Sequence, residues 1–218
     1  MSKIMLEVGH VKTCCLCSNL ASGAPRPRWD EPLFESANFI AMPSLGSIVE
    51  GWMLIVPRIH FVSMGALSSK LAEEMESLKS RVAQYLTSTY GDLCTFEHGP
   101  GRIGRQVGCG VDHAHIHVVP VAFDLITAST PYLPPDVRWR DADLADCSAA
   151  FERGQDYLYV EQPLGRGRIA VHDKFGSQIF RKAIAAQAGL PDRFNWRDYP
   201  NFENIARTIE ACRASAST

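Results

Sequence analysis

The chain has 218 residues, of which 46% are apolar and 21% are charged. A chain of this length buries roughly 70% of the surface that it exposes when unfolded, which excludes a miniprotein that folds only with disulfide bonds. The 22 Lys and Arg residues and 24 Asp and Glu residues leave a net charge of -2, which argues against nucleic acid or an anionic membrane as a partner.

The start of the chain and its cysteines favour a cytoplasmic protein. Met1–Lys12 alternates charged and apolar residues and never forms the apolar core of a secretory signal. The longest apolar run, Trp52–Pro57, is far shorter than the ~20 residues of a membrane helix. The 7 cysteines are an odd number, and Cys14 and Cys15 are adjacent, a pattern unlike a disulfide framework. We expect ordinary reduced thiols at Cys94, Cys109, Cys147 and Cys212.

The first half of the chain predicts strands around one long helix. Short apolar runs at Phe39–Met42 and Trp52–Val56 are separated by Pro and Gly, which predicts two antiparallel strands. Between Leu67 and Leu86, apolar residues recur every three or four positions and predict an amphipathic helix, with Ser68 or Ser69 as its cap.

A glycine-rich loop lies between the next two predicted strands. Leu93–Glu97 is the first of these, and His113–Val119, with period-two alternation and β-branched residues, is the second. The loop carries Gly99, Gly101, Gly104, Gly108 and Gly110. Closely spaced backbone N–H groups in such a loop form a site for an anion such as phosphate, although a simple flexible connection is the alternative.

The second half of the chain gives weaker signals for helices and strands. We interpret residues 124–150, with several prolines, as a connection with one short helix. Strands are predicted at Tyr157–Val160 and Ile169–Val171. A helix is predicted at Ser177–Ala188, before Gly and Pro, and a last one at Asn201–Cys212.

Three histidines share one face of the predicted strand. On an extended strand His113, His115 and His117 are spaced ~6.6 Å apart, and a row of three buried imidazoles is an improbable packing solution. The outer pair lie ~13 Å apart, whereas Zn–N bonds are only ~2.1 Å long, so all three cannot bind one metal without strain. At least one histidine is therefore left for other chemistry.

These residues carry a resemblance to a known family. The sequence His113-Ala-His115-Ile-His117-Val-Val resembles the His-x-His-x-His-x-x signature of the histidine triad (HIT) superfamily. Upstream, Gly51-Trp-Met-Leu-Ile-Val-Pro57-Arg-Ile-His60 resembles the Gly-His-x-Leu-Val-x-Pro-x-x-His segment of the family, and Cys14-Cys-Leu-Cys17 stands where many members carry Cys-x-x-Cys. The resemblance covers about residues 12–122.

The resemblance implies an α+β fold, with a HIT-like antiparallel sheet packed against one long helix. We expect residues 1–122 to form the nucleotide-binding catalytic domain and residues 123–218 to form a C-terminal α/β extension that selects the substrate. Many relatives are dimers, which implies a homodimer here.

The resemblance also implies the chemistry. His115 would be the nucleophile that attacks an α-phosphorus, and His117 would donate to the phosphate or the leaving-group oxygen. The glycine loop, with Gly108 and Gly110, and Arg102 or Arg105 would neutralise phosphates. We expect hydrolysis of a small nucleotide or nucleotide conjugate, NMP-X. A nucleotidyltransferase or phosphorylase that uses a phosphorylated acceptor, and a non-catalytic nucleotide-binding module, are the alternatives.

The resemblance assigns a different role to the first histidine. In zinc-bearing members it joins an upstream histidine and the cysteine pair, which here gives Cys14, Cys17, His60 and His113. A closed Cys2His2 set suits a structural Zn²⁺ without an open position for water. Reduced, unligated thiols are one alternative, and Cys15 in place of a neighbouring cysteine is another.

Some positions depart from the family pattern. Trp52 stands where a histidine is common, and Gly110 stands where Ser or Thr often contacts phosphate. Residues 96–99 and 108–113 resemble the galactose-1-phosphate uridylyltransferase branch, which places Glu97 or, preferably, His98 against the substrate.

The start of the predicted 177–188 helix offers a further phosphate site, formed by Ser177, Gln178 and Arg181. A solvated helix face is the alternative.

Overall fold

The computed structural model describes residues 14–20, 28–105, 107–108, 110–163 and 165–216. Within these ranges an antiparallel sheet of eight strands has the order β1-β2-β3-β5-β4-β7-β8-β6. The strands are β1 (Phe34–Glu35), β2 (Phe39–Pro43), β3 (Met53–Pro57), β4 (Leu93–Gly99), β5 (Ile116–Pro120), β6 (Arg140–Asp141), β7 (Tyr157–Glu161) and β8 (Gly167–Val171). The α-helices are α1 (Cys15–Leu20), α2 (Ser69–Tyr90), α3 (Leu125–Ser129), α4 (Leu144–Glu152), α5 (Ile179–Gln187) and α6 (Phe202–Ala216).

The predicted α+β class, with a HIT-like sheet and one long helix, is confirmed. Short 3-10 turns join the larger elements at η1 (Arg28–Asp30), η2 (Met64–Ala66), η3 (Thr130–Tyr132) and η4 (Pro191–Phe194). No helix within the described ranges is long and apolar enough to cross a membrane. The predictions made for Met1–Lys12 and for Cys109 lie outside the described residues.

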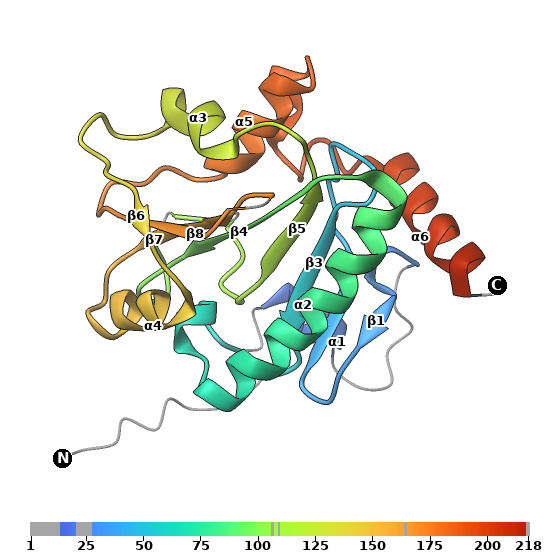
Figure 1. Ribbon diagram of the computed structural model, residues 1–218, viewed down its shortest axis with the longest axis horizontal. Helices are drawn as coiled ribbons and strands as arrows, with labels where there is room; N and C mark the ends of the chain where they lie inside the picture. The colour runs from blue at the N-terminus through green and yellow to red at the C-terminus, as the bar shows by residue number, and fades with distance from the viewer. Residues whose placement is uncertain (1–13, 21–27, 106, 109, 164, 217–218) are drawn as a thin grey trace.

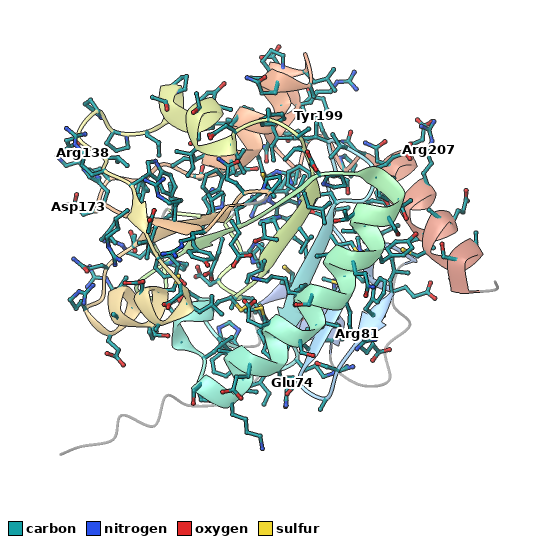
Figure 2. The ribbon with its side chains drawn as sticks, viewed as in Figure 1. Glu74, Arg81, Arg138, Asp173, Tyr199 and Arg207 are labelled. Atoms are coloured by element: carbon teal, nitrogen blue, oxygen red, sulfur yellow. The ribbon has the colours of Figure 1, made fainter. Side chains whose placement is uncertain are left out.

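The long helix α2 begins after the predicted cap Ser68, spans the predicted amphipathic pattern and continues past Leu86 to Tyr90. The Ser68 side chain accepts a hydrogen bond from the Leu71 N–H, and Gly91 ends the helix with a φ of 88°. Figure 1 shows the green helix α2 lying across the sheet. Its buried apolar stripe consists of Met75, Leu78, Val82 and Leu86. The polar side carries Glu74 and Arg81, labelled in Figure 2. The stripe therefore holds α2 across the sheet.

The pleat of β5 divides its side chains between two faces of the sheet. Ile116 and Val118 belong to the core under α2, whereas Val119 belongs to the apolar cluster that contains Phe180 of α5. The ring of His117 stacks on Phe96, and Phe96 in turn contacts Phe180. Figure 1 shows α2 and α4 apart from α3 and α5, in agreement with the separate apolar clusters. The histidine face is therefore the one that α1 and α5 border.

The strand predicted over His113–Val119 is wrong at its start. β5 begins at Ile116, because the backbone N–H of Ala114 donates to the carbonyl of Phe61 at 2.7 Å instead of joining the ladder. Of the three histidines only His117 lies on regular strand. The expected single row of imidazoles is therefore broken.

The region predicted as a connection with one short helix contains more structure. It holds α3, η3, β6 and α4. Asp124 caps α3, and Asp143 forms a capping box with Asp146 at the start of α4. Aspartate at these two positions is the helix-start signal that the prolines obscured.

Strands after residue 122 continue the same sheet. β7 pairs with β4, with Glu97 opposite Tyr159, and β8 pairs with β7. The two strands predicted here and the helices predicted at 177–188 and 201–212 are confirmed, with α5 and α6 at those places. The division into residues 1–122 and 123–218 stays a prediction.

Candidate functional site

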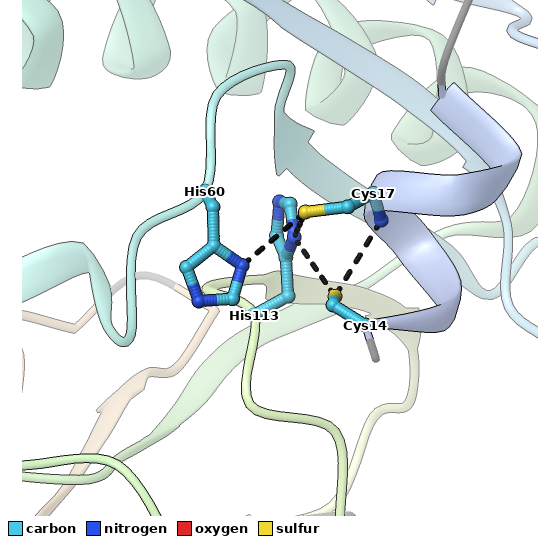
Figure 3. Close-up of side chains that lie close together, drawn as sticks. All are labelled: Cys14, Cys17, His60 and His113. Carbon is cyan, nitrogen blue, oxygen red and sulfur yellow. Dashed lines mark hydrogen bonds between the residues drawn. The ribbon is translucent and has the colours of Figure 1, made fainter. Parts of the chain in front are cut away.

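Two cysteines and two histidines meet at the start of α1 (Figure 3). Cys14 and Cys17 are three residues apart, so one helical turn places both sulfurs on the same side. His60 follows β3 and His113 precedes β5. The four ligand atoms all lie within 4.8 Å of one another, and the Sγ of Cys17 is 3.3 Å from Nδ1 of His60.

His113 presents its Nδ1 to the two sulfurs. Its Nε2 lies 2.9 Å from the carbonyl oxygen of Pro57. Because a carbonyl only accepts, Nε2 carries the proton and Nδ1 keeps a lone pair, 3.5 Å from the Sγ atoms of Cys14 and Cys17. Burial lowers the pKa of His60, which keeps that ring neutral as well. Two thiols and two neutral imidazoles are a donor set that zinc favours, so the cluster is compatible with zinc.

A pocket opens next to this cluster, and His115 and His117 line it. One wall is apolar and comes from α1, β2, β3 and the segment before β5, with Leu16, Met42, Leu54 and Val111. The pocket thus combines two imidazole side chains with an apolar wall.

His115 is held in one tautomer. Its Nδ1 lies 2.7 Å from the carbonyl oxygen of His113, which can only accept, so Nδ1 carries the proton. Nε2 therefore keeps its lone pair. Burial lowers the pKa of His115, and the positive charge of Arg181 acts in the same direction. The ring is accordingly neutral near pH 7, with a lone pair on Nε2.

His117 lies against aromatic rings. It stacks on Phe96 with centroids 4.3 Å apart and an interplanar angle of 19°. The indole Nε1–H of Trp52 donates to its Nδ1 at 3.0 Å. Burial, with the nearby His115, His98 and Arg181, lowers the pKa of His117 well below its ordinary value. The ring is therefore neutral and fixed in orientation.

Arg181 brings a buried positive charge to the same pocket. It lies in the first turn of α5, is 1% exposed and lines the pocket. Its Nε–H donates to the carbonyl of Phe194 at 2.8 Å, and a terminal N–H donates to the carbonyl of Gly46. The guanidinium carbon lies 4.8 Å from the ring centroid of Trp52. These contacts fix the guanidinium beside the histidines.

Gly46 is required for that arrangement. Its φ is 79°, and a Cβ built on it would lie 2.7 Å from Nη2 of Arg181 and 2.5 Å from Cβ of Trp196. A side chain here would strain the backbone and displace the arginine. The glycine thus makes room for two residues from the far end of the chain.

His98 and Glu97 point to opposite faces of the sheet, as neighbours on a strand must. The Phe180 N–H lies 3.5 Å from Nε2 of His98, and burial lowers the pKa of that ring to about 3. His98 is not among the pocket-lining residues described, but lies behind His117, with ring centroids 6.5 Å apart. Glu97 faces the other side, where the Met64 N–H and the Tyr157 hydroxyl donate to it.

The two arginines of the glycine loop lie away from the histidines. Arg105 donates from Nε to Asp156 at 2.7 Å and lines a second, polar pocket with Asp173. Arg102 is exposed. Neither is among the residues that line the histidine pocket.

The glycine loop itself contacts the segments around α5. Gly108 forms a parallel bridge with Ser177, and the backbone N–H of Gln178 donates to the Gly108 carbonyl at 2.9 Å. Gly110 has a φ of 71° and its carbonyl accepts from Arg197 at 3.0 Å. Ser177, Gln178 and the loop are brought together, but Arg181 is the residue of this group that lines the pocket.

Sequence reasoning missed several polar and aromatic lining residues. Asn19 donates from Nδ2 to Asp30 at 2.6 Å, and both line the pocket. Ser44 directly follows β2, and its place just beyond the strand predicted over Phe39–Met42 is a signal that would have found it. Trp29 and Trp196 also line the pocket, but neither lies in a motif.

The geometry can be set beside known proteins. The family model described as "Protein similar to CwfJ C-terminal" matches residues 34–132. A HIT-like protein of Mycobacterium tuberculosis is 25% identical over 107 residues, which cover 49% of this chain and 70% of that protein. The chain is similar to HIT-like proteins. The resemblance seen in the motifs is thereby confirmed, and the finer likeness to the uridylyltransferase branch stays a prediction.

Two further relatives extend the comparison. Zinc finger CCCH domain-containing protein 64 of Arabidopsis thaliana is 26% identical over 180 residues, which cover 73% of this chain but only 28% of that protein. The crystal structure of a zinc-bound histidine triad family protein from Mycobacterium smegmatis has a TM-score of 0.40 and 19% identity, and the match covers 65% of this chain and 94% of that one. The family model ends before Arg181. The M. tuberculosis match covers about half of this chain.

Proposed function

We propose that the protein hydrolyses the α-phosphate linkage of a small nucleotide conjugate, NMP-X, through a nucleotidyl-histidine intermediate. The observation that carries this proposal is the tautomer of His115, whose Nδ1 donates to the His113 carbonyl and whose Nε2 keeps a lone pair. His117 and Arg181 line the same pocket. A nucleophile, a second imidazole and a cation in one pocket are the groups that this reaction needs.

In the first step, Nε2 of His115 attacks the α-phosphorus. A nitrogen–phosphorus bond forms, the bond from phosphorus to X breaks, and X leaves with the bonding electron pair as X⁻. The imidazole becomes cationic, and the His113 carbonyl that accepts from Nδ1 stabilises that charge. Arg181 and the N–H of His117 stabilise the charge on the phosphoryl oxygens.

In the second step, water attacks the phosphorus. The nitrogen–phosphorus bond breaks, the electron pair returns to Nε2 of His115, and the proton that water loses goes to X⁻. The sum of both steps is NMP-X and water converted into NMP and XH. The first step needs a neutral His115, which burial and the charge of Arg181 favour by lowering its pKa.

The apolar wall would seat the nucleoside. Leu16 and Met42 are suited to contact a base, and Asn19 and Asp30 offer hydrogen-bonding groups within the same pocket. The segment after residue 122 contributes Arg181 and Trp196 to the pocket, which supports a role for the predicted extension in selecting the substrate.

The cysteine–histidine cluster would hold a structural zinc ion. Four protein ligands leave no coordination position for water, so the ion would fix α1 and the segment before β5 and take no part in the chemistry. Because α1 supplies part of the apolar wall, the metal would shape the pocket from a distance. The proposal also includes a cytoplasmic protein and a homodimer.

Two other functions remain as competing proposals. A nucleotidyltransferase would use a phosphorylated acceptor in place of water in the second step, and the position of Arg181 suits a second phosphate equally well. A binding module would keep the pocket without turnover. The His115 tautomer favours catalysis, because a neutral ring with an available lone pair is what a nucleophile requires.

A substrate panel tests the proposal. Purified protein is mixed with nucleoside monophosphates joined through the α-phosphate to a nucleotide, a phosphate, a sugar phosphate or an amine, and release of NMP is followed by chromatography. We expect turnover with water alone. Product that forms only with a phosphorylated acceptor would establish the transferase instead. Binding of nucleotides by calorimetry without any release of NMP would overturn the catalytic proposal.

A further inference from the structure

Trp52 makes a hydrogen bond whose direction is chemically fixed. The residue directly precedes β3 and is fully buried. Its indole Nε1–H lies 3.0 Å from Nδ1 of His117. An indole nitrogen donates and never accepts, so Nδ1 of His117 must supply the lone pair.

That direction determines where the proton of His117 lies. A neutral imidazole carries one N–H, and if Nδ1 accepts, the proton is on Nε2. Burial keeps the ring neutral near pH 7 by lowering its pKa. The stacked ring of Phe96 holds the imidazole plane, and the imidazole lines the pocket together with His115.

The neighbouring histidine has the opposite tautomer. Nδ1 of His115 donates to a carbonyl, which leaves Nε2 with the lone pair. The two rings lie side by side, with centroids 4.9 Å apart and planes at 73°. One ring is therefore set as a nucleophile and the other as a hydrogen-bond donor, and each is set by a partner that has only one possible role.

The same indole also supports the cation of the pocket. The guanidinium carbon of Arg181 lies 4.8 Å from the centroid of the Trp52 ring. A cation over the face of an indole is attracted to its π-electrons. Trp52 thus contacts both groups that would stabilise the phosphoryl oxygens, without lining the pocket itself.

We infer that Trp52 is a positioning residue that holds His117 as the Nε2–H tautomer, so that this N–H donates to an oxygen of the reacting phosphate. The inference rests on the proposed function for its catalytic consequence. Its structural part, the tautomer, stands independently of any activity.

The first test measures the tautomer in the wild-type protein. Two-bond ¹H–¹⁵N spectra of ¹⁵N-labelled protein at pH 7.5 distinguish a protonated from an unprotonated ring nitrogen, and the His117→Gln variant assigns the signal. We expect Nδ1 to be the unprotonated nitrogen and Nε2 the protonated one. A wild-type His117 with its proton on Nδ1 would overturn the inference, whatever any variant does.

The second test removes the indole N–H and keeps an aromatic ring. We expect Trp52→Phe to add the Nδ1–H tautomer to the His117 spectrum and to lower kcat about 10-fold, with KM changed less than about 2-fold, since one neutral hydrogen bond is lost. The matched control is Trp139→Phe, because Trp139 packs against the same apolar cluster and lines no part of the pocket. That control should keep the wild-type tautomer.

The outcomes separate the inference from the proposed function. Turnover in the wild type with an unchanged tautomer and kcat in folded Trp52→Phe would overturn the inference and leave the hydrolase intact. Absence of turnover in the wild type, with the Nε2–H tautomer observed, would remove the catalytic consequence while the tautomer is upheld. If Trp52→Phe does not fold, the wild-type spectrum decides.

Discussion

The thiol cluster and the histidine pocket lie side by side, and His113 and His115 show how they differ. Both rings donate to a backbone carbonyl, but from opposite nitrogens. His113 donates from Nε2 to Pro57, which leaves Nδ1 for the sulfurs, whereas His115 donates from Nδ1 and keeps Nε2. The role of each histidine therefore depends on its backbone partner more than on its place in the motif.

The two sites also differ in which parts of the chain they need. The cluster is complete with residues between Cys14 and His113. The pocket includes Arg181, which reaches it from α5 because Gly46 leaves space. A local motif can therefore specify the proposed metal site, whereas the histidine pocket depends on packing between distant segments.

Removing the donor imidazole should have the largest effect on the pocket. We expect His117→Ala to lower kcat/KM about 10³-fold, because its N–H no longer stabilises the charge on the phosphoryl oxygens. Steady-state release of NMP measures the change. His172→Ala is the control, because His172 pairs with Asp136 outside the pocket. Equal losses in both variants would contradict a specific role for His117.

Removing the cation should cost somewhat less. We expect Arg181→Met to lower kcat/KM about 10²- to 10³-fold, the usual cost of one group aimed at transition-state charge. The control is Arg138→Met, since Arg138 is exposed and donates only to carbonyls of its own loop in the contacts described. A wild-type rate in Arg181→Met would show that the pocket does not need the extension.

A substitution in the cysteine–histidine cluster should change the stability of the protein and not the chemical step. We expect Cys17→Ser to lose bound zinc and about 3 kcal/mol of unfolding free energy, which is a fall in Tm of about 6–12 °C for a chain of this size. Metal analysis and calorimetry measure both quantities. Cys15→Ser, which changes an exposed neighbouring thiol, should keep the metal and the Tm. Wild-type protein purified without zinc, with normal stability, would contradict a structural metal.

The smallest expected effect concerns Glu97, which lies on the face of β4 opposite to His98. Burial raises the pKa of Glu97 to about 7, so the folded state favours the protonated acid and its stabilising contribution falls as pH rises from about 4.5 through 7. Relative to Glu97→Gln, wild type should lose about 2 kcal/mol of unfolding free energy between pH 5 and pH 8.

Urea unfolding at several pH values measures this difference. The histidines with lowered pKa values change stability in the opposite direction, so only the comparison between the two proteins isolates Glu97. Glu73→Gln, at an exposed position on α2, should follow the wild-type curve. Parallel curves of unfolding free energy against pH for wild type and Glu97→Gln would contradict the raised pKa of Glu97.

Much of the fold and of the metal cluster follows from local patterns. Ser68 marks the start of the long helix, and the family resemblance implies the cluster of Cys14, Cys17, His60 and His113. The start of β5 does not follow, because the alternation of residues 113–119 contains no sign that Ala114 bonds to Phe61. The capped helices around Asp124 and Asp143 were hidden by nearby prolines.

The chemistry is harder to predict from sequence. In the sequence, Trp52 stands where the family motif has a histidine, which suggests a lost function. Its indole N–H lies 3.0 Å from Nδ1 of His117, and only this contact shows that Trp52 is a hydrogen-bond donor. Arg181 carries no motif, and its distance from the triad along the chain conceals its place in the pocket. Arg102 and Arg105 lie near the triad in sequence, yet the loop directs Arg105 to Asp156. Proximity in sequence is therefore a poor guide to which cation lines the histidine pocket.

Rapid quenching of a single turnover tests the central claim most directly. NMP-X is mixed with an excess of wild-type protein, and the reaction is stopped with base, digested and analysed by mass spectrometry. We predict an acid-labile nucleotidyl group on the peptide that contains His115, formed and consumed at the rate of turnover and absent from His115→Ala. Turnover without any adduct, or a wild-type rate in His115→Ala, would contradict the account.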